Sequence, residues 1–429
     1  MKIYCLTLGC AKNRVDGECL AGALAAAGHV LVPAVEEAEC ALVNTCGFIR
    51  PAVEESIAAI LDLEELKKDK KLQKIGVVGC LVNRYERDLP SEVPLVDFWA
   101  KTEDWKFVLE QLKTPGDDER HRGTLPSSSK YTRYLKISEG CGNHCTYCAI
   151  PGIRGPLRSL PAAVIVKEAQ QLVSEGAREL CVVGQDLTVY GTDIDGRPRL
   201  TELLDDLESS LPRDVWIRLL YLHPSRVNRA LLERVAAGRQ LLPYLDIPVQ
   251  HGDPEILAAM NRGIAPDALR AIFRTARVIN PDFALRTTCM VGFPGETKRR
   301  FDNLMDFVRE VKFDRMGAFT FFPEEGTEAA AMAGQVSERT KDGRLGELMR
   351  LQEEISFERQ QQFVGRELKV LVEKVAGEEK YAEGRSFREA PEVDGIIEIR
   401  NIREDLKEGD IITLRVTEAM PHDMTGEEI

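Results

Sequence analysis

The stretch EGCGNHCTYCAIP, residues 139–151, is the most informative part of this chain and decides the architecture that we expect for it. It carries cysteines at 141, 145 and 148, in the spacing C-x3-C-x2-C. A loop this compact can wrap three thiolates around one face of an iron–sulfur cube, which leaves the fourth iron without a protein ligand. An open iron can bind a small molecule directly, so Cys141, Cys145 and Cys148 are candidate metal ligands with a chemical role.

A zinc knuckle or three buried thiols is the alternative interpretation of the same loop. Structural zinc prefers four ligands, usually supplied as two separated pairs. His144 lies inside the loop and could act as a fourth ligand, so the spacing alone leaves zinc open.

Around this loop, residues 131–356 alternate between six strand candidates and intervening amphipathic helices. The strand candidates are YLKISEG, ELCVVGQD, WIRLLYL, YLDIPVQ, FALRTTCMVGFPGE and RMGAFTFF. Six β/α repeats predict a partial barrel related to the (β/α)8 arrangement, whose chemistry lies at the C-terminal ends of the strands. The cysteine loop directly follows the first strand candidate, which is the position expected for a catalytic loop.

The chain on either side predicts two further domains. Residues 1–112 alternate strands and helices, which is typical of an α/β domain with a parallel sheet covered on both faces. Residues 113–130 are polar, rich in Gly, Pro and Ser and without period, and predict a linker. Residues 357–429 predict a linking helix followed by a small all-β barrel. The fold class expected is therefore α/β, with a partial (β/α)6 barrel and a C-terminal OB-like barrel.

Three more cysteines, Cys10, Cys46 and Cys80, each follow a predicted strand of the N-terminal domain, in LTLGC, LVNTC and GVVGC. The C-terminal ends of parallel strands lie along one edge of a sheet, where ligands gather. The three thiols could therefore meet although 36 and 34 residues separate them. Because buried free cysteines are common and inert, spacing alone leaves a second metal cluster and ordinary packing equally open.

Composition limits the classes of partner and compartment. The 429 residues carry a formal charge of −13, and residues 364–429 hold ten Lys/Arg against seventeen Asp/Glu. This balance argues against phosphate binding as the main task of the C-terminal barrel and favours a basic partner. No apolar run approaches a membrane span, and the eleven cysteines with no export signal predict a reducing compartment, the cytoplasm.

The loop at 139–151 resembles the signature of the radical S-adenosylmethionine (SAM) enzymes. The segments LGCAKNRVD, NTCGFIRPAVEESI and GVVGCLV resemble the N-terminal domain of the radical SAM methylthiotransferases, and the resemblance covers essentially the full chain, including a C-terminal TRAM domain. It implies two [4Fe–4S] clusters, one on each cysteine trio, and SAM as cofactors. NTCGFI, VVGQDLTVYG, YLDIPVQH and FTFFPEEGTEAA are most similar to the branch that methylthiolates an aspartate of small-subunit ribosomal protein twelve.

The resemblance also implies residues that contact SAM. Tyr147, just before the last cysteine, would cover the adenine, and Gly184 and Gln185 would replace the element that binds the SAM amino group. Gln250 would contact ribose or carboxylate. Arg286 would pair with the SAM carboxylate, with an ordinary salt bridge as the alternative. No residue is expected as a general acid or base, because abstraction of a C–H hydrogen by a radical needs none.

The mechanism implied by the resemblance is abstraction of hydrogen from the aspartyl β-carbon by a deoxyadenosyl radical, followed by transfer of a methylated sulfur. The partners implied are ribosomal protein twelve, free or on the ribosome, an external electron donor and a sulfur source, with no membrane and with RNA contact open but not favoured. Two alternatives remain: an enzyme of the same family acting on a tRNA adenosine, and a non-enzymatic iron–sulfur electron carrier. Carriers normally close their clusters with four ligands, which weighs against the second alternative.

Overall fold

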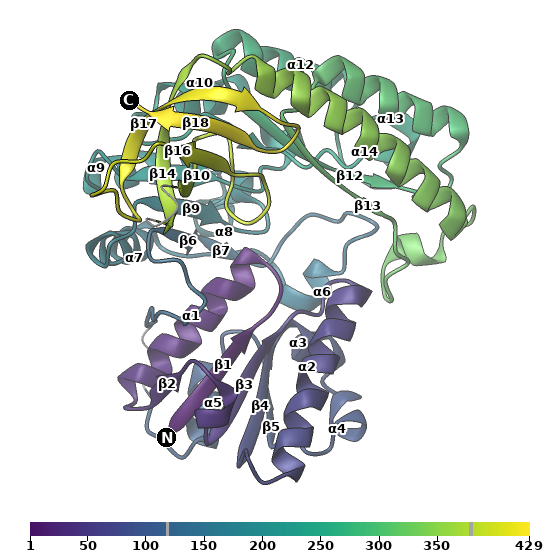
Figure 1. Ribbon diagram of the computed structural model, residues 1–429. Helices are drawn as coiled ribbons and strands as arrows, with labels where there is room; N and C mark the ends of the chain where they lie inside the picture. The colour runs from purple at the N-terminus through teal and green to yellow at the C-terminus, as the bar shows by residue number, and fades with distance from the viewer. Residues whose placement is uncertain (117–119, 377–380) are drawn as a thin grey trace.

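The computed structural model describes residues 1–116, 120–376 and 381–429, and it contains three bodies built around separate sheets (Figure 1). The first is a five-stranded, fully parallel sheet in the order β2-β1-β3-β4-β5. Its strands are β1 (Lys2–Thr7), β2 (Val30–Val32), β3 (Cys40–Thr45), β4 (Lys74–Gly79) and β5 (Phe98–Ala100). We refer to this body as the N-terminal domain.

Helices cover both faces of this sheet because its central strands are apolar on both sides. Every residue of β3 is buried, as expected for a central strand of a parallel sheet. The helices α1 (Ala11–Ala26) and α5 (Trp105–Gln111) pack on one face, and α2 (Arg50–Lys68), α3 (Cys80–Tyr85) and α4 (Leu89–Glu92) pack on the other. Pro51 occupies the first turn of α2, where its missing N–H costs no hydrogen bond.

The second body, the central barrel, has six parallel strands in chain order. They are β6 (Thr132–Lys136), β9 (Glu179–Val183), β10 (Trp216–Leu219), β11 (Tyr244–Asp246), β12 (Ala284–Val291) and β13 (Arg315–Thr320). Hydrogen bonding is continuous within β6-β9-β10 and within β11-β12-β13, and a bridge from Ile217 to Leu241 joins the two halves. Among the described residues β6 does not pair with β13, so the barrel is partial, as the sequence predicted.

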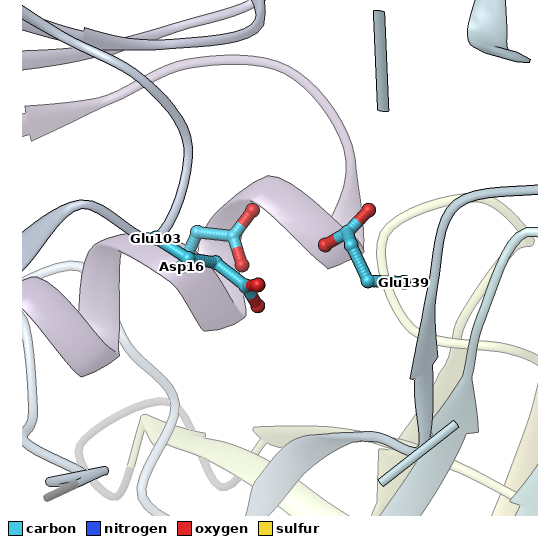
Figure 2. A group of neighbouring side chains, drawn as sticks. All are labelled: Asp16, Glu103 and Glu139. Carbon is cyan, nitrogen blue, oxygen red and sulfur yellow. The ribbon is translucent and has the colours of Figure 1, made fainter. Parts of the chain in front are cut away.

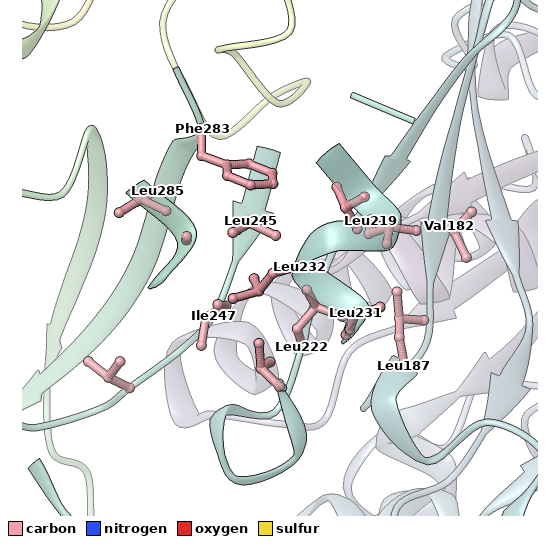
Figure 3. Packing of buried hydrophobic residues seen from close by; sticks show 14 of the residues in the cluster. Val182, Leu187, Leu219, Leu222, Leu231, Leu232, Leu245, Ile247, Phe283 and Leu285 are labelled. Carbon is pink, nitrogen blue, oxygen red and sulfur yellow. The ribbon is translucent and has the colours of Figure 1, made fainter. Parts of the chain in front are cut away.

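Amphipathic helices pack on the outer face of the central barrel. These helices are α7 (Ala162–Ser174), α9 (Leu200–Ser210), α10 (Arg229–Ala237), α12 (Pro266–Ile279) and α13 (Lys298–Val311). Three short helices, α6 (Ile150–Arg154), α8 (Thr192–Asp195) and α11 (Pro254–Ala259), lie in the connections between the strands. Figure 3 shows Leu231 and Leu232 of α10 beside residues of several strands, among them Leu219 and Leu245. Each helix thus buries one apolar stripe against the strands, and the strand ends remain free to carry polar loops.

The third body is a closed five-stranded barrel in the order β14-β15-β16-β18-β17, which follows the long helix α14 (Glu338–Gln361). Its strands are β14 (Glu367–Ala376), β15 (Tyr381–Arg385), β16 (Ile397–Arg400), β17 (Ile411–Ala419) and β18 (Met424–Glu428). The fold class expected from the sequence is confirmed. Among the described residues, no helix is both long and apolar enough to cross a membrane.

The loop between β15 and β16 fastens the C-terminal barrel to the N-terminal ends of the central strands. Glu179, the first residue of β9, binds Arg218 of β10 and Arg385 of β15, each through a nitrogen–oxygen distance of 2.6 Å, and all three side chains are buried. Asp394 accepts a hydrogen bond of 2.6 Å from the hydroxyl of Tyr244. The loop at residues 386–394 therefore lies against the N-terminal ends of β10 and β11, where Phe387 accepts from Arg218 and Asp394 accepts from Tyr244.

Candidate iron–sulfur and S-adenosylmethionine sites

Cys10, Cys46 and Cys80 lie at the C-terminal edge of the N-terminal sheet, as the strand pattern predicted. Cys10 is the residue before α1, Cys46 follows β3 directly, and Cys80 begins α3 directly after β4. Cys10 is exposed, whereas Cys46 and Cys80 are buried. One edge of the sheet thus presents three thiols from three separate loops.

Glycines let these three loops approach each other. Gly9 has φ +89°, and a Cβ there would lie 2.7 Å from the Cβ of Cys46. A Cβ on Gly47 would lie 2.7 Å from the carbonyl oxygen of Cys80. Since real Cβ atoms essentially never come so close, any side chain at these positions would push the cysteine loops apart.

The core cysteine loop follows β6 and the short strand β7 (Ser138–Glu139), at the C-terminal side of the central barrel. The amide of Cys141 donates to the carbonyl of Gly155, and the amide of Cys148 donates to the carbonyl of Cys145. All three thiols are half-buried. Gly140, with φ +73°, makes the turn into the loop, since a Cβ there would collide with the carbonyl oxygen of Pro156.

Burial favours the protonated state of four of these thiols, Cys46, Cys80, Cys141 and Cys148, while no metal is bound. Burial raises the pKa of Cys80 and that of Cys148 to about 12 in each case, and burial also raises the pKa of Cys46 and Cys141. Iron must therefore displace these protons, and the resulting thiolates would be stable only as metal ligands in such poorly solvated positions.

The spacing of the sulfur atoms fits a cluster better than a single ion. A tetrahedral zinc ion with Zn–S bonds of about 2.3 Å holds its sulfurs about 3.8 Å apart. Among the described residues, neither cysteine trio has all its sulfurs within 4.8 Å of one another. His144 is exposed and does not complete such a group with the core cysteines. Each trio supplies three thiols, which is the ligand set of a cubane cluster with one open iron, so the residues present fit the cofactor that the sequence implied.

Each cysteine trio receives one hydrogen bond from a buried arginine. The Nε of Arg154, in α6, lies 3.1 Å from the Sγ of Cys80, and Nη1 of Arg262 lies 3.4 Å from the Sγ of Cys145. Arg154 comes from the central barrel, whereas Cys80 belongs to the N-terminal domain. The N-terminal thiol site is therefore complete only when the two bodies are docked.

A buried charge network holds Arg154 in place. Its Nη1 binds Asp16 at 2.7 Å and Glu139 at 2.8 Å. The Nζ of Lys136 binds the same two carboxylates and Glu103, which Figure 2 shows together as one acidic group. This is the one described group of potential metal ligands whose atoms all lie within 4.8 Å. Because the Lys136 ammonium binds all three carboxylates, the group is an ion-pair network and not a cation site.

Gln185 and Gln250 are the SAM-contact candidates whose surroundings best fit a ligand. Gln185 follows β9 and donates from Nε2 to Glu139 at 2.9 Å, but its Oε1 is buried with no partner. Gln250 has φ +73°, and its Oε1 is likewise buried and unpaired. Since buried acceptors are normally satisfied, two orphaned amide oxygens point to a missing donor such as an amino or hydroxyl group.

The other expected SAM contacts have different surroundings. Gly184 directly follows β9 and lies beside Ser138, whose hydroxyl would lie 2.7 Å from a Cβ at that position. Tyr147 packs partly buried against the apolar cluster that contains Met290 and Phe293. Arg286 lies near the N-terminal end of β12 and pairs with Asp246 at 2.9 Å and with Asp394 at 3.4 Å. This is the ordinary salt bridge that the sequence left open for Arg286.

Arg154 and Arg262 are the site residues that the sequence did not reveal. Neither belongs to a recognisable motif, and each reaches its cysteine across a long stretch of chain. A cavity of about 330 Å³ adjoins the core loop and is lined by Cys145, Cys148, residues 83–84 of α3 and residues 325–328. Its position beside two of the core thiols places a ligand-sized space at the expected cluster.

Three family models match the chain. They are an uncharacterized protein family, UPF0004, over residues 2–101, the radical SAM superfamily over residues 135–308, and the TRAM domain over residues 364–429. The radical SAM match contains the core cysteine loop, and the UPF0004 match contains Cys10, Cys46 and Cys80.

Curated relatives are similar over the whole length. Proteins named "Ribosomal protein uS12 methylthiotransferase RimO" from Geobacter sulfurreducens, Heliobacterium modesticaldum and Aquifex aeolicus are 40%, 42% and 41% identical, in that order. Each comparison covers 100% of this chain and 98%, 95% and 97% of the relative.

Solved structures share the fold at low sequence identity. The radical S-adenosylmethionine methyltransferase TsrM from Kitasatospora setae, solved with tryptophan and a SAM analogue, has a TM-score of 0.56 and 14% identity over 74% of this chain and 72% of TsrM. The cobalamin-dependent radical enzyme OxsB, with aqua-cobalamin bound, has a TM-score of 0.51 and 12% identity over 82% of this chain and 56% of OxsB.

Proposed function

This chain belongs to the family of radical SAM methylthiotransferases named for ribosomal protein uS12, and we propose that it adds a methylthio group to the β-carbon of an aspartate of that protein. The observation that carries the proposal is the pair of three-cysteine sites, one at the edge of the N-terminal sheet and one at the mouth of the central barrel. Sequence identity of about 40% over the full length to proteins named as uS12 methylthiotransferases supports the assignment of uS12 as the substrate.

We propose Cys141, Cys145 and Cys148 as ligands of the cluster that binds SAM, and Cys10, Cys46 and Cys80 as ligands of the second cluster. When bound, the two clusters and SAM supply the reducing cleavage that yields a carbon-centred radical and the sulfur that enters the product. The protein's part is to hold these groups in fixed positions and to orient the substrate between them.

The residues around the core loop support the proposed SAM site. The free Oε1 atoms of Gln185 and Gln250 are available to accept from amino or hydroxyl groups of SAM. The Nε2 of Gln185 donates a hydrogen bond to Glu139, which fixes the orientation of the side-chain amide before SAM binds. Tyr147 offers an aromatic surface beside the last cysteine. Arg286 is neutralised by two carboxylates, so its contact with the SAM carboxylate has weaker support than the contacts of Gln185 and Gln250.

Arg154 and Arg262 act on the two thiolate sets. A hydrogen bond from a cationic donor to a cysteine sulfur stabilises the thiolate and fixes the direction of its lone pairs. Both guanidiniums are buried, so solvent screens their charge little. Each arginine therefore lowers the energetic cost of negative charge at its own cysteine trio.

Charge and cysteine chemistry support the proposed setting. A chain with a net charge of −13 favours encounter with a basic ribosomal protein more than with RNA. All eleven cysteines are free thiols, which suits a reducing compartment, and we place the reaction in the cytoplasm. Reducing equivalents and fresh sulfur come from partners outside this chain.

The test is an anaerobic reaction of the reconstituted enzyme with SAM, reductant and sulfide, offering purified uS12 and a tRNA anticodon stem-loop in the same tube. We expect mass spectrometry to locate a methylthio group on one aspartate of uS12 and none on the RNA. Modification of the RNA alone would contradict the proposal and assign the chain a nucleic-acid substrate.

A further inference from the structure

Lys12 lies between the N-terminal thiol site and the central barrel. It is the second residue of α1, two positions after Cys10, and it is half-buried. Its Nζ lies 3.5 Å from the centroid of the Tyr221 ring, which belongs to the segment after β10. The ammonium is thus held where a residue of the N-terminal domain meets one of the central barrel.

The ring of Tyr221 is held in place by its backbone. Tyr221 has φ +68°, a left-handed conformation that is rare for a bulky residue. Its amide donates to Oδ2 of Asp246 at 3.0 Å, and its carbonyl accepts from the amide of Leu187 at 3.1 Å. Strained backbone that surrounding contacts maintain is concentrated at functional sites, so the position of this ring deserves a functional explanation.

Lys12 differs from the neighbouring cations, which are paired with carboxylates. Arg154 binds Asp16 and Glu139, and Arg14 binds Glu392. No carboxylate in the described ranges pairs with Lys12. An ammonium that loses water without gaining a carboxylate is unfavourable, and the face of one tyrosine offsets only part of that loss. Lys12 is therefore open to a carboxylate, which none of the described residues supplies.

We propose that Lys12, with Tyr221 beneath it, binds the side-chain carboxylate of the aspartate that is modified. The inference rests on the proposed function, because it assigns a place to that substrate. The reacting β-carbon of an aspartyl residue is bonded directly to its carboxylate carbon. A site that brings this carbon to sulfur at the N-terminal thiols must therefore hold the carboxylate beside them, and Lys12 is two residues from Cys10.

The same contact explains selection for aspartate. A protonated amine gains a charge-assisted hydrogen bond with a carboxylate, whereas the neutral amide of asparagine or the neutral ring of adenine offers only weaker contacts. Loss of one hydrogen bond to a charged group weakens binding by roughly tenfold to a hundredfold. Lys12 thus sets which substrate is held, and Tyr221 positions Lys12.

The experiment measures binding without turnover. Labelled peptides from the target loop of uS12, with aspartate or asparagine at the modified position, are titrated with the anaerobic holoenzyme in the absence of reductant. The dissociation constants are taken from fluorescence anisotropy. We expect the wild-type enzyme to bind the aspartate peptide roughly tenfold to a hundredfold more tightly than the asparagine peptide. Equal affinity for the two peptides would overturn the inference without any variant.

Three variants assign the preference to Lys12. K12M should bring the ratio of the two dissociation constants close to one, and K12R should retain most of the ratio because it retains the charge. K130M is the matched control, since the Nζ of Lys130 also lies over a tyrosine ring, 5.5 Å from the centroid of Tyr131. K130M should leave the ratio unchanged.

The outcomes separate this inference from the proposed function. A K12M enzyme that still prefers aspartate as strongly as wild type would overturn the role of Lys12, while modification of uS12 by the wild-type enzyme would keep the proposed function. Iron and sulfide content are measured for each variant first. If K12M has lost iron, the K12R enzyme is used in its place. K12R keeps the positive charge, so an iron-replete K12R enzyme that binds the aspartate and asparagine peptides equally would contradict an electrostatic contact at residue 12.

Discussion

The buried ion pairs of Glu179 predict a large loss of stability at one place in the molecule. Its two carboxylate oxygens bind Arg218 and Arg385, and no side chain of the three is more than 2% exposed. The substitution E179Q keeps the shape of the side chain but removes its charge. Two buried guanidiniums then lose their shared anion, although Arg385 keeps Glu373 at 2.7 Å.

The expected loss can be worked out in two ways. Removing one partner of a buried ion pair typically costs about 3–5 kcal/mol. Independently, the two arginines, acting against burial, lower the pKa of Glu179 from 4.5 to about 2. At about 1.4 kcal/mol for each tenfold change in proton affinity, this corresponds to about 3 kcal/mol of stability at neutral pH. Both routes therefore place the loss near 3 kcal/mol.

Trp216 makes the loss measurable at the contact itself. It is buried in a cluster with Leu371 and Ala390 of the C-terminal barrel. In a W99F/W105F background it is the only tryptophan of the three in the chain, so its fluorescence during urea unfolding follows this contact. The free energy of unfolding of E179Q should be about 3 kcal/mol lower than that of the parent.

An exposed ion pair across the same contact supplies the control. Asp282 accepts from Nη1 of Arg366 at 2.9 Å, but both side chains are more than 40% exposed. The substitution D282N should therefore cost about 1 kcal/mol or less. If E179Q costs no more than D282N, the reasoning from burial is refuted.

The buried carboxylate of Glu179 also predicts how the stability of the protein depends on pH in the acid range. A carboxyl group whose pKa falls on folding contributes its full stability above the unfolded pKa, and that contribution is lost as the pH falls through the folded pKa. The parent should therefore lose the Glu179 contribution between about pH 4.5 and about pH 2. E179Q should lack this part of the acid transition, and identical acid transitions in the two proteins would contradict the assignment.

Three further predictions concern the thiol sites. Alanine at Cys10, Cys46 and Cys80 together should halve the iron content and abolish methylthio transfer, while reductive SAM cleavage persists. Iron analysis and chromatography of the nucleoside product would measure these effects. Loss of SAM cleavage in this variant would refute the assignment of two independent sites. R154K should lower the reduction potential of the N-terminal cluster and leave the core cluster unchanged, because lysine cannot reproduce the Nε hydrogen bond to sulfur, and an EPR-monitored redox titration would measure this. R262K should do the reverse, and a shift of both clusters by either variant would contradict the pairing of one arginine with one site.

The alternation of strands and helices was predictable because it is a local property of the sequence. Five of the six strands of the central barrel lie within the predicted runs, and β6 begins two residues before its run, at Thr132. Cys10, Cys46 and Cys80 follow their strands as expected. Parallel strands buried on both faces leave long apolar runs, which periodicity detects directly. Cys40, Cys181 and Cys289 lie outside both cysteine trios and are buried as packed thiols.

The elements that the sequence did not reveal are short, polar or dependent on distant partners. Strand β5 has three residues, and β15 and β18 contain glycine and charged residues that only their neighbours in the closed barrel order. The linking helix begins at Glu338, before the region 357–429 in which the sequence predicted it, with Ser337 accepting from the amide of Thr340 as its N-cap. Such features depend on pairing and capping contacts that a periodicity pattern does not contain.

The electrostatics of the site were the least predictable part. Arg154 and Cys80 are 74 residues apart, and Arg262 and Cys145 are 117 apart, so no local pattern connects them. Arg286 has a carboxylate partner, Asp394, on the C-terminal barrel, which a search within the central strands could not find. The sequence predicts which residues can bind iron, and the tertiary structure determines which charges surround them.

The loop at 386–394 has a consequence for protein engineering and for domain shuffling in evolution. By sequence the C-terminal barrel resembles an exchangeable module appended to a catalytic core. Energetically it is not exchangeable, because Arg388 donates to the buried Asp314 and Glu389 binds the buried Arg315. A barrel taken from another protein must therefore carry an arginine and a carboxylate at these two positions. A chimera that replaces residues 364–429 without these partners would take Arg388 away from Asp314 and Glu389 away from Arg315, which leaves buried charges without part of their compensation. A fragment transferred to another protein should therefore keep the C-terminal barrel together with its ion-pair partners on the central barrel, and its boundary should not be placed at the helix that joins the two barrels.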